Sequence, residues 1–385
     1  MESTGAMDIL NGGTISNSTS GSGDAGNITV KAGALKIEGI NNILSTGIYA
    51  ISTDSGNSGN INVDVKETLS LLHGGAIDTS TFSLGKAGDI TVKTAKLRSD
   101  GKTDILQLNG QEIPLGRFFY PSGIFSIAKY GSSEQTGSLN ITATHLIQLS
   151  NLGKMSIENQ SSAVDPTKIE AGNIVVNSAD IDMEGSEITS NSAGNVTAGN
   201  IVVNFTHQLN MDSSFISTTA NSGDGGKITI NGGELTQLKN SGFTTTVSGR
   251  DSNGGDIFSK TDTLVMNNGL IQANAVSGSG GDISLNLKAL IPSGNTLLLG
   301  GSTLVWQPSE FGFNLIQAAS QNGVSGTVNV TAPQLNLSGI IANLGSPQFN
   351  TDIISQDYCG LGAGSSLTRT GAGGLKPKSS NQLLF

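Results

Sequence analysis

The chain has 385 residues, of which 53 are glycine, 13% are charged and only 4% are aromatic. This composition excludes an ordinary helical protein, which needs Ala, Glu, Lys and Leu at 3.6-residue spacing, and the 36% of regularly placed apolar residues excludes a disordered chain. The formal net charge of −10 and the scattered positions of the 20 basic residues disfavour binding to nucleic acid or to an anionic membrane.

The N-terminus, residues 1–6, has neither the basic nor the apolar region of a signal peptide. Residues 7–16 already match the interior of the repeat that fills the rest of the chain. We therefore expect this chain to be the C-terminal part of a longer protein, or a shortened reading frame. No apolar run approaches the ~20 residues of a membrane span, so no membrane span is predicted.

A five-residue motif recurs ten times: a glycine, then most often Asn or Asp, then an apolar residue, then usually Thr, Asn or Ser, and last an apolar residue in every copy except the one that ends at Ser259. Between Gly172 and Gly281 successive copies start 27, 27, 29 and 26 residues apart. The alternation predicts a short strand with one buried face, and a period of this length is typical of stacked-repeat architectures. The leading glycines are Gly26, Gly59, Gly88, Gly137, Gly172, Gly199, Gly226, Gly255, Gly281 and Gly326.

The start of each five-residue motif predicts a turn. The leading glycine is expected to supply a backbone conformation that residues with a Cβ avoid, and the Asn or Asp after it tolerates the left-handed region. When copies stack, these Asn and Asp corners are expected to form hydrogen bonds along the stack.

Two further short strands follow each five-residue motif. The first has the pattern Leu-x-apolar, as in residues 209–211, and the second is apolar and then rich in Ser, Thr and Ala, as in residues 215–218. Three strands and three turns in about 27 residues predict one coil of a parallel β-helix, and the Leu-x-x-Leu pattern of leucine-rich repeats is missing. We therefore predict an all-β, right-handed parallel β-helix solenoid over residues 1–345, followed by a Gly-rich C-terminal tail over residues 346–385.

Two long intervals, of 49 residues after Gly88 and 45 after Gly281, predict insertions near residues 100–121 and 292–311. Both leave the coil between its second and third strands. Their aromatic residues either fold each loop back over the solenoid or form a contact platform on a rigid scaffold, and both interpretations stay open. The candidate partner contacts are Phe118, Phe119, Tyr120, Trp306 and Phe311.

Few residues suggest a catalytic or metal-binding role. His73, His145 and His207 follow no metal or catalytic spacing and are expected to be exposed beside the second strand. Cys359 is the only cysteine, so it is interpreted as a free or intermolecular thiol. The Asp- and Gly-rich turns lack the nine-residue period of calcium-binding repeats.

Enzymes that act on polysaccharides need clustered carboxylates with a basic or histidine partner, whereas the acidic residues here are spread over the turns. We predict no catalytic, cofactor-binding or metal-binding residues, and no enzyme activity.

The repeat Ala-Gly-Asn-Ile-x-Val, the segment 290–296 and the tail segments 359–367 and 373–377 resemble the filamentous haemagglutinin-type exoproteins of two-partner secretion in Gram-negative bacteria. The resemblance implies a secreted or outer-membrane surface protein, exported at full length through an outer-membrane transporter. It also implies adhesion to a glycan or protein of a host or neighbouring cell. One departure is that none of the eight prolines follows an Asn, whereas the family's secretion domain carries Asn-Pro motifs. We do not expect this chain to be exported by that route by itself.

The resulting hypothesis is a non-enzymatic, adhesin-like passenger fragment. Two alternatives stay open. The chain is either a β-helix enzyme or lectin that acts on polysaccharide, or a purely structural spacer that holds a distal domain away from the cell.

Overall fold

The computed structural model describes residues 1–331 apart from 40–44, 83, 104, 109–110, 115–119, 130–134, 161, 251, 294–296 and 301–311, and within 102–120 it describes the backbone alone. The chain divides into two compact units, Met1–Leu335 and Asn336–Phe385. The second unit, with the predicted Gly-rich tail and Cys359, lies outside the described residues.

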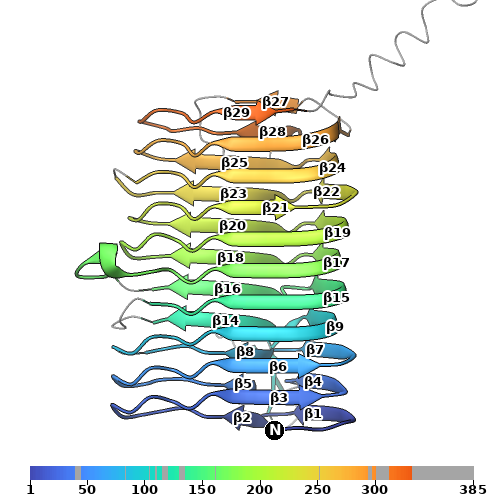
Figure 1. Cartoon of the computed structure of the whole chain (residues 1–385), viewed down its shortest axis with the longest axis vertical. Helices are drawn as coiled ribbons and strands as arrows, with labels where there is room; N and C mark the ends of the chain where they lie inside the picture. Colours follow the sequence, from blue (N-terminus) through green and yellow to red (C-terminus); the bar gives the residue numbers. More distant parts are fainter. Residues whose placement is uncertain are drawn as a thin grey trace, which may run out of the picture. The chain divides into compact units, whose positions relative to one another are not determined.

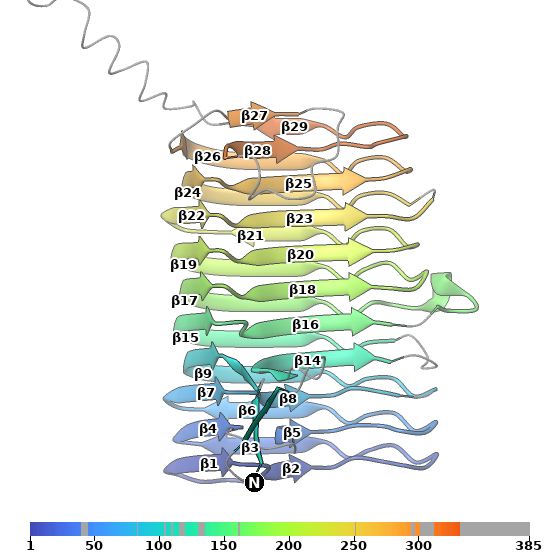
Figure 2. The ribbon, with the colours of Figure 1, turned by 180° about the vertical axis from the view of Figure 1, so that it is seen from behind.

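The first unit contains two long parallel sheets, here called sheet A and sheet B, which lie back to back (Figures 1 and 2). Sheet A consists of β1 (Ala6–Leu10), β3 (Ile28–Ala32), β4 (Ala34–Glu38), β6 (Ile61–Val65), β7 (Thr68–Leu72), β9 (Ile90–Asp100), β15 (Leu139–Ser150), β17 (Ile174–Glu184), β19 (Ile201–Asp212), β21 (Ile228–Asn231), β22 (Leu235–Lys239), β24 (Ile257–Asn267), β26 (Ile283–Pro292) and β29 (Val328–Val330). Sheet B consists of β2 (Thr14–Ser16), β5 (Thr46–Tyr49), β8 (Gly75–Asp78), β14 (Gly123–Ala128), β16 (Lys154–Asn159), β18 (Glu187–Ser192), β20 (Phe215–Ala220), β23 (Gly242–Val247), β25 (Leu270–Ala275), β27 (Leu297–Leu299) and β28 (Asn314–Gln317).

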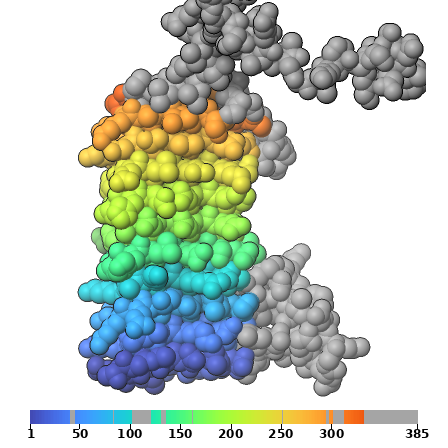
Figure 3. Space-filling model, turned by 90° about the vertical axis from the view of Figure 1, so that its right-hand side faces the viewer, coloured from blue at the N-terminus to red at the C-terminus, as the bar shows by residue number. Residues whose placement is uncertain are grey.

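Each coil runs along sheet A, turns back along sheet B, and returns to sheet A one strand further on, so the solenoid is right-handed (Figure 1). Equivalent residues pair from coil to coil: Ile174 pairs with Ile201, and Ile201 with Ile228. In the space-filling view successive coils form bands in sequence order (Figure 3). The predicted parallel β-helix is confirmed. A single short 3-10 helix, Pro166–Lys168, lies in the longest turn between sheet B and sheet A within the described ranges.

The first two predicted strands of each coil belong to the same sheet. They are separate in β3/β4, β6/β7 and β21/β22, but merge into one long strand in β9, β15, β17, β19, β24 and β26. The pairing register shifts between Thr142 and Leu146 and between Ser178 and Asp180, which marks a β-bulge. A bulge leaves its extra residue unpaired and bends the strand, and the pairing of sheet A resumes directly after it.

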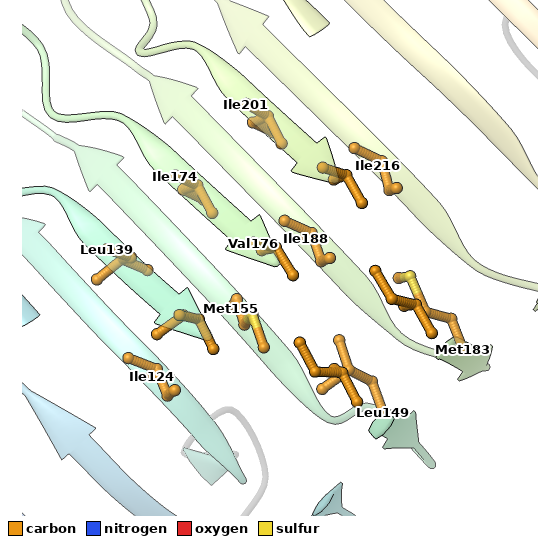
Figure 4. Close-up of a cluster of buried hydrophobic side chains, with 14 of the residues drawn as sticks. Ile124, Leu139, Leu149, Met155, Ile174, Val176, Met183, Ile188, Ile201 and Ile216 are labelled. Atoms are coloured by element: carbon orange, nitrogen blue, oxygen red, sulfur yellow. The ribbon is translucent and has the colours of Figure 1, made fainter. Parts of the chain in front are cut away.

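The interior is a packed column of apolar side chains from both sheets (Figure 4). From sheet A, Leu139, Ile174 and Ile201 stack in register and are fully buried. Because alternate residues of each strand point inward, the same inward positions meet in every coil. The facing column from sheet B is Ile124, Met155, Ile188 and Ile216.

The leading glycines are required for a different reason from the predicted one. None of the ten is in the left-handed region, although all are described, and neither are the Asn and Asp residues that follow them. A Cβ on Gly199 would lie 1.7 Å from the carbonyl oxygen of Gly172 in the preceding coil. Glycine is therefore needed because two backbones approach closely, and the left-handed expectation is wrong. The left-handed residues lie instead where sheet A turns into sheet B, for example Asn151 (φ 49) and Asn240 (φ 47).

The predicted hydrogen bonding along the corners is confirmed. The Asn173 Oδ1 accepts the backbone N–H of Asn200 at 2.9 Å, and the Asn200 Oδ1 accepts that of Lys227 at 2.8 Å. Ser138 occupies the same position, and its Oγ accepts the N–H of Asn173 at 3.1 Å. The chain itself therefore shows that serine can replace asparagine at this corner.

Replacing Ile201 by Asp should prevent cooperative folding, whereas Asn200→Ser should change the free energy of unfolding only slightly. A carboxylate at the fully buried Ile201 would cost several kcal/mol, comparable to the stability of a whole domain. Serine preserves the corner acceptor, so the loss should be about 1 kcal/mol or less. Thermal melts measure both, and equal losses would contradict the coil register.

Two buried threonine hydroxyls differ in their hydrogen bonding. Thr218 and Thr236 are both fully buried on the inward face. The Thr218 Oγ1 donates to the carbonyl oxygen of Gly226 at 2.7 Å. The Thr236 Oγ1 has no hydrogen-bond partner among the described residues.

Thr236→Val should therefore raise the free energy of unfolding by about 1 kcal/mol, because it removes an unpaired buried hydroxyl at nearly constant shape. Thr218→Val is the matched control and should lower it by about 1–3 kcal/mol, since it leaves a buried carbonyl without its donor. Denaturant titration of both variants measures the difference. Shifts of the same sign would show that the hydrogen bonding of the buried hydroxyl does not determine the change in the free energy of unfolding.

Candidate functional site

The predicted partner contacts lie almost entirely beyond the described part of the chain. Phe118, Phe119, Trp306 and Phe311 are outside it. Tyr120 begins β13 (Tyr120–Pro121), where the backbone alone is described. The role of these five aromatic residues stays a prediction.

The segments that carry these residues leave the solenoid at one corner. The first joins the end of β9 at Asp100 to β14. The second joins the end of β26 at Pro292 to β28 and contains β27, which pairs with β28 in sheet B. Sheet A counts six strand steps between β9 and β26, so their starting points lie about 29 Å apart at about 4.8 Å per step. The first segment forms two short antiparallel pairs, β10 (Lys102–Thr103) with β13 and β11 (Ile105–Leu108) with β12 (Gln111–Pro114), seen in front of sheet B at the level of β5 and β8 (Figure 2).

Asp100 anchors the start of the first segment. Its Oδ1 accepts hydrogen bonds from the Ser150 Oγ at 2.9 Å and the Asn151 Nδ2 at 2.8 Å, both from the next coil. Its Oδ2 accepts one from the Arg98 guanidinium at 2.7 Å. Burial alone would raise the pKa of Asp100, but the hydrogen bonds from Asn151, Ser150 and Arg98 together outweigh it and lower the pKa.

This lowered pKa makes stability pH-dependent. The ionised Asp100 should stabilise the fold fully above the unfolded-state pKa of about 3.9, and the contribution should be lost as the pH falls through the lower folded-state pKa. The difference in melting temperature between the native chain and Asp100→Asn should therefore be largest at neutral pH and shrink below about pH 4. A difference that stays constant from pH 7 to pH 2 would contradict this role.

The three histidines lie on different coils and share no site. The Nδ1 of His73 lies 3.3 Å from the Glu38 carboxylate, and that of His207 lies 3.6 Å from Asp180. His145 contacts the neighbouring Thr144 hydroxyl at 2.8 Å. His73 also has a left-handed backbone (φ 48), so it serves as a turn residue at the corner between the sheets. Within the described ranges, no three His, Cys, Asp or Glu residues are grouped so as to hold a metal ion.

A shallow groove of about 250 Å³ lies on the outer face of sheet A, over the second halves of β15, β17 and β19 and over β22. The sequence analysis did not predict it. Its floor follows the backbone of Leu149, Met183 and Met211, whose side chains point into the buried column. Two rows of outward side chains line it, an inner row of Gln148, Asp182, Asn210 and Gln237 and an outer row of Ser150, Glu184, Asp212 and Lys239.

The pairing register sets the dimensions of this groove. Asp182 pairs with Asn210 and Glu184 pairs with Asp212, so neighbours within a row stand one strand spacing, about 4.8 Å, apart. Asp182 and Glu184 are two residues apart on one strand, so the rows are separated by about 6.6 Å. Since every position belongs to a hydrogen-bonded strand, the spacing is rigid.

Hydrogen bonds and one ion pair order the groove. The Asn210 Nδ2 donates to the Asp182 Oδ1 at 3.0 Å, and the Lys239 Nζ lies 2.7 Å from the Asp212 Oδ2. The hydrogen bond from Lys239 lowers the pKa of Asp212, and the same bond raises the pKa of Lys239. At neutral pH the pair is therefore a carboxylate and an ammonium group. Such a groove offers fixed acceptors and donors to a polar ligand.

The sequence analysis described the acidic residues as spread over the turns, whereas the structure brings Asp182, Glu184 and Asp212 together. The pattern that could have revealed this is the repeat itself, because Asp182 and Asn210 are 28 residues apart and Asp212 and Lys239 are 27 residues apart. Residues one repeat apart on the same strand position become neighbours on the outer face.

Comparison with models of known protein families, with curated proteins and with solved structures finds no match to this chain. In the part of the chain that the structure describes, no helix has the length and apolar character needed to cross a bilayer.

Proposed function

We propose that the chain is a non-enzymatic, adhesin-like binding segment that holds a glycan or protein of a host or neighbouring cell against the outside of the solenoid. The observation that carries this proposal is the polar groove over β15, β17, β19 and β22. The interior column is filled with apolar side chains, so a partner is bound on the outside. A rigid outer face whose donors and acceptors are already ordered loses little conformational entropy when it binds a ligand.

The resemblance to filamentous haemagglutinin-type exoproteins supports the same proposal. It extends it to a secreted or outer-membrane surface location, and to export of the full-length protein through an outer-membrane transporter. The aromatic residues Phe118, Phe119, Tyr120, Trp306 and Phe311 are proposed as further contacts. A longer upstream reading frame beside a transporter gene would support the export route.

A polysaccharide-cleaving enzyme is the competing function, and the carboxylates of the groove are the observation that favours it. Such chemistry needs one carboxyl group that stays protonated to act as the acid. The ion pair with Lys239 keeps Asp212 ionised, so Asp212 is not such an acid, and we favour binding over cleavage. We expect no reducing ends and no unsaturated products when the chain is incubated with pectin- or alginate-type polymers.

Adhesion is tested with beads coated with the purified chain. Coated beads should attach to host or neighbouring bacterial cells above the level of uncoated beads. Deleting residues 199–225, one complete coil that contributes Asn210 and Asp212 to the groove, should reduce attachment to that level. The deletion runs from one leading glycine to the next, so the flanking coils can stack in register.

Deleting residues 59–87 is the matched control, because it also removes one complete coil but leaves the groove whole. This variant should attach like the native chain. Equal attachment by both deletion variants would favour a structural spacer or a partner site elsewhere. Coated beads that attach no better than uncoated beads would contradict the proposed function itself.

A further inference from the structure

We propose that the groove lined by the two rows over β15, β17, β19 and β22 binds an uncharged glycan chain that lies along the solenoid axis, with one sugar unit to each coil. This inference rests on the proposed binding function and assigns it a ligand class and a place.

The spacing of the groove supports an extended glycan. Each row repeats at the strand spacing of about 4.8 Å, which is close to the length of one pyranose unit in an extended polysaccharide. Four successive coils line the groove, so a linear oligosaccharide along the axis meets polar side chains at the same two positions at every unit. A globular protein surface has no such repeat.

The side chains of the groove suit hydroxyl groups. Sugar hydroxyls both donate and accept hydrogen bonds, and the inner row contains three amides and one carboxylate. The Asn210 amide donates to Asp182 and is therefore already oriented, while the Gln148 side chain in the same row is exposed. In the outer row, the Glu184 side chain is exposed and makes no hydrogen bond or ion pair in the described part of the chain, although its charge helps to raise the pKa of Lys239. Its carboxylate is free to accept from a ligand hydroxyl.

The charge of the groove selects among glycans. Asp182, Glu184 and Asp212 contribute three negative charges and Lys239 one positive charge, so the net charge is −3 + 1 = −2. Polymers that carry a carboxylate or sulfate on each unit would place like charges next to these residues, and such contacts oppose binding. We therefore assign the groove to neutral hexose or N-acetylhexosamine chains.

The test is isothermal titration of the purified full chain with gluco-, manno- and N-acetylglucosamine oligosaccharides of two to six units, and with oligogalacturonates of the same lengths. Affinity for at least one neutral series should rise with length up to four units and then level off. Oligogalacturonates should bind about tenfold more weakly than that series, or not at all.

A matched pair of variants separates the groove from the rest of the surface. Asp212 and Asp262 are both half-buried aspartates that pair with a lysine of the next coil at 2.7 Å, Lys239 and Lys288 respectively. Asp262 lies outside the groove. Asp212→Ala should weaken neutral-glycan binding about tenfold, while Asp262→Ala should bind like the native chain. Asp212→Ala should lower the melting temperature slightly more than Asp262→Ala, because Asp212 also accepts a hydrogen bond from the Ser213 hydroxyl at 3.1 Å.

Charge reversal tests the selection rule. Glu184→Lys should raise the affinity for oligogalacturonate while lowering that for the neutral series. The inference is overturned if no oligosaccharide binds, if affinity does not depend on length, or if Asp212→Ala and Glu184→Lys bind like the native chain. Coated beads that still attach to cells in that case would leave the proposed function standing with a different site.

Discussion

The structure depends on how closely the backbones of successive coils approach one another at the leading glycines. A Cβ on Gly199 would overlap the carbonyl oxygen of Gly172, and most of the other leading glycines stand in the same relation to the coil before them. This close approach lets each coil pair with the next along both sheets. It also brings the Asn and Asp corners within hydrogen-bond distance of the next backbone N–H. Without side chains at the contact, the strand spacing is kept in every coil.

This constraint decides where a function can reside. Strict stacking fills the interior with apolar columns and leaves no room there for a ligand. On the outside the same stacking places equivalent residues in straight rows. The side chains that interact there are therefore one repeat apart in the sequence and are not neighbours in the chain. The Lys239–Asp212 and Lys288–Asp262 ion pairs both arise in this way. The groove on sheet A is the place where such rows combine donors with acceptors.

Much of the fold was predictable because its determinants are local and repeated. The five-residue glycine motif, the alternation of apolar residues and the repeat length together specify short strands. Such strands cannot bury their apolar faces alone, which favours a stacked solenoid. Predictions that depended on conformation were less successful. The glycines were assigned to left-handed turns, but they are needed where backbones meet. The first two strands of a coil were expected to be separate, but they form one continuous strand in six coils, and a β-bulge marks the junction in the pairing of β9, β15, β17 and β19. A bulge leaves no marker in composition.

The sequence by itself determined the architecture, the buried column and the corner hydrogen bonds, because each follows from a residue type that recurs at one period. Only the tertiary structure decided the outer face. The groove needs Asp182, Asn210, Asp212 and Lys239 to stand in one register, and the length of each bulge and turn sets that register. One residue more in a turn or a bulge would move the following side chains out of their rows. The period alone therefore predicts that coils stack, whereas the pairing of individual residues decides which charges meet.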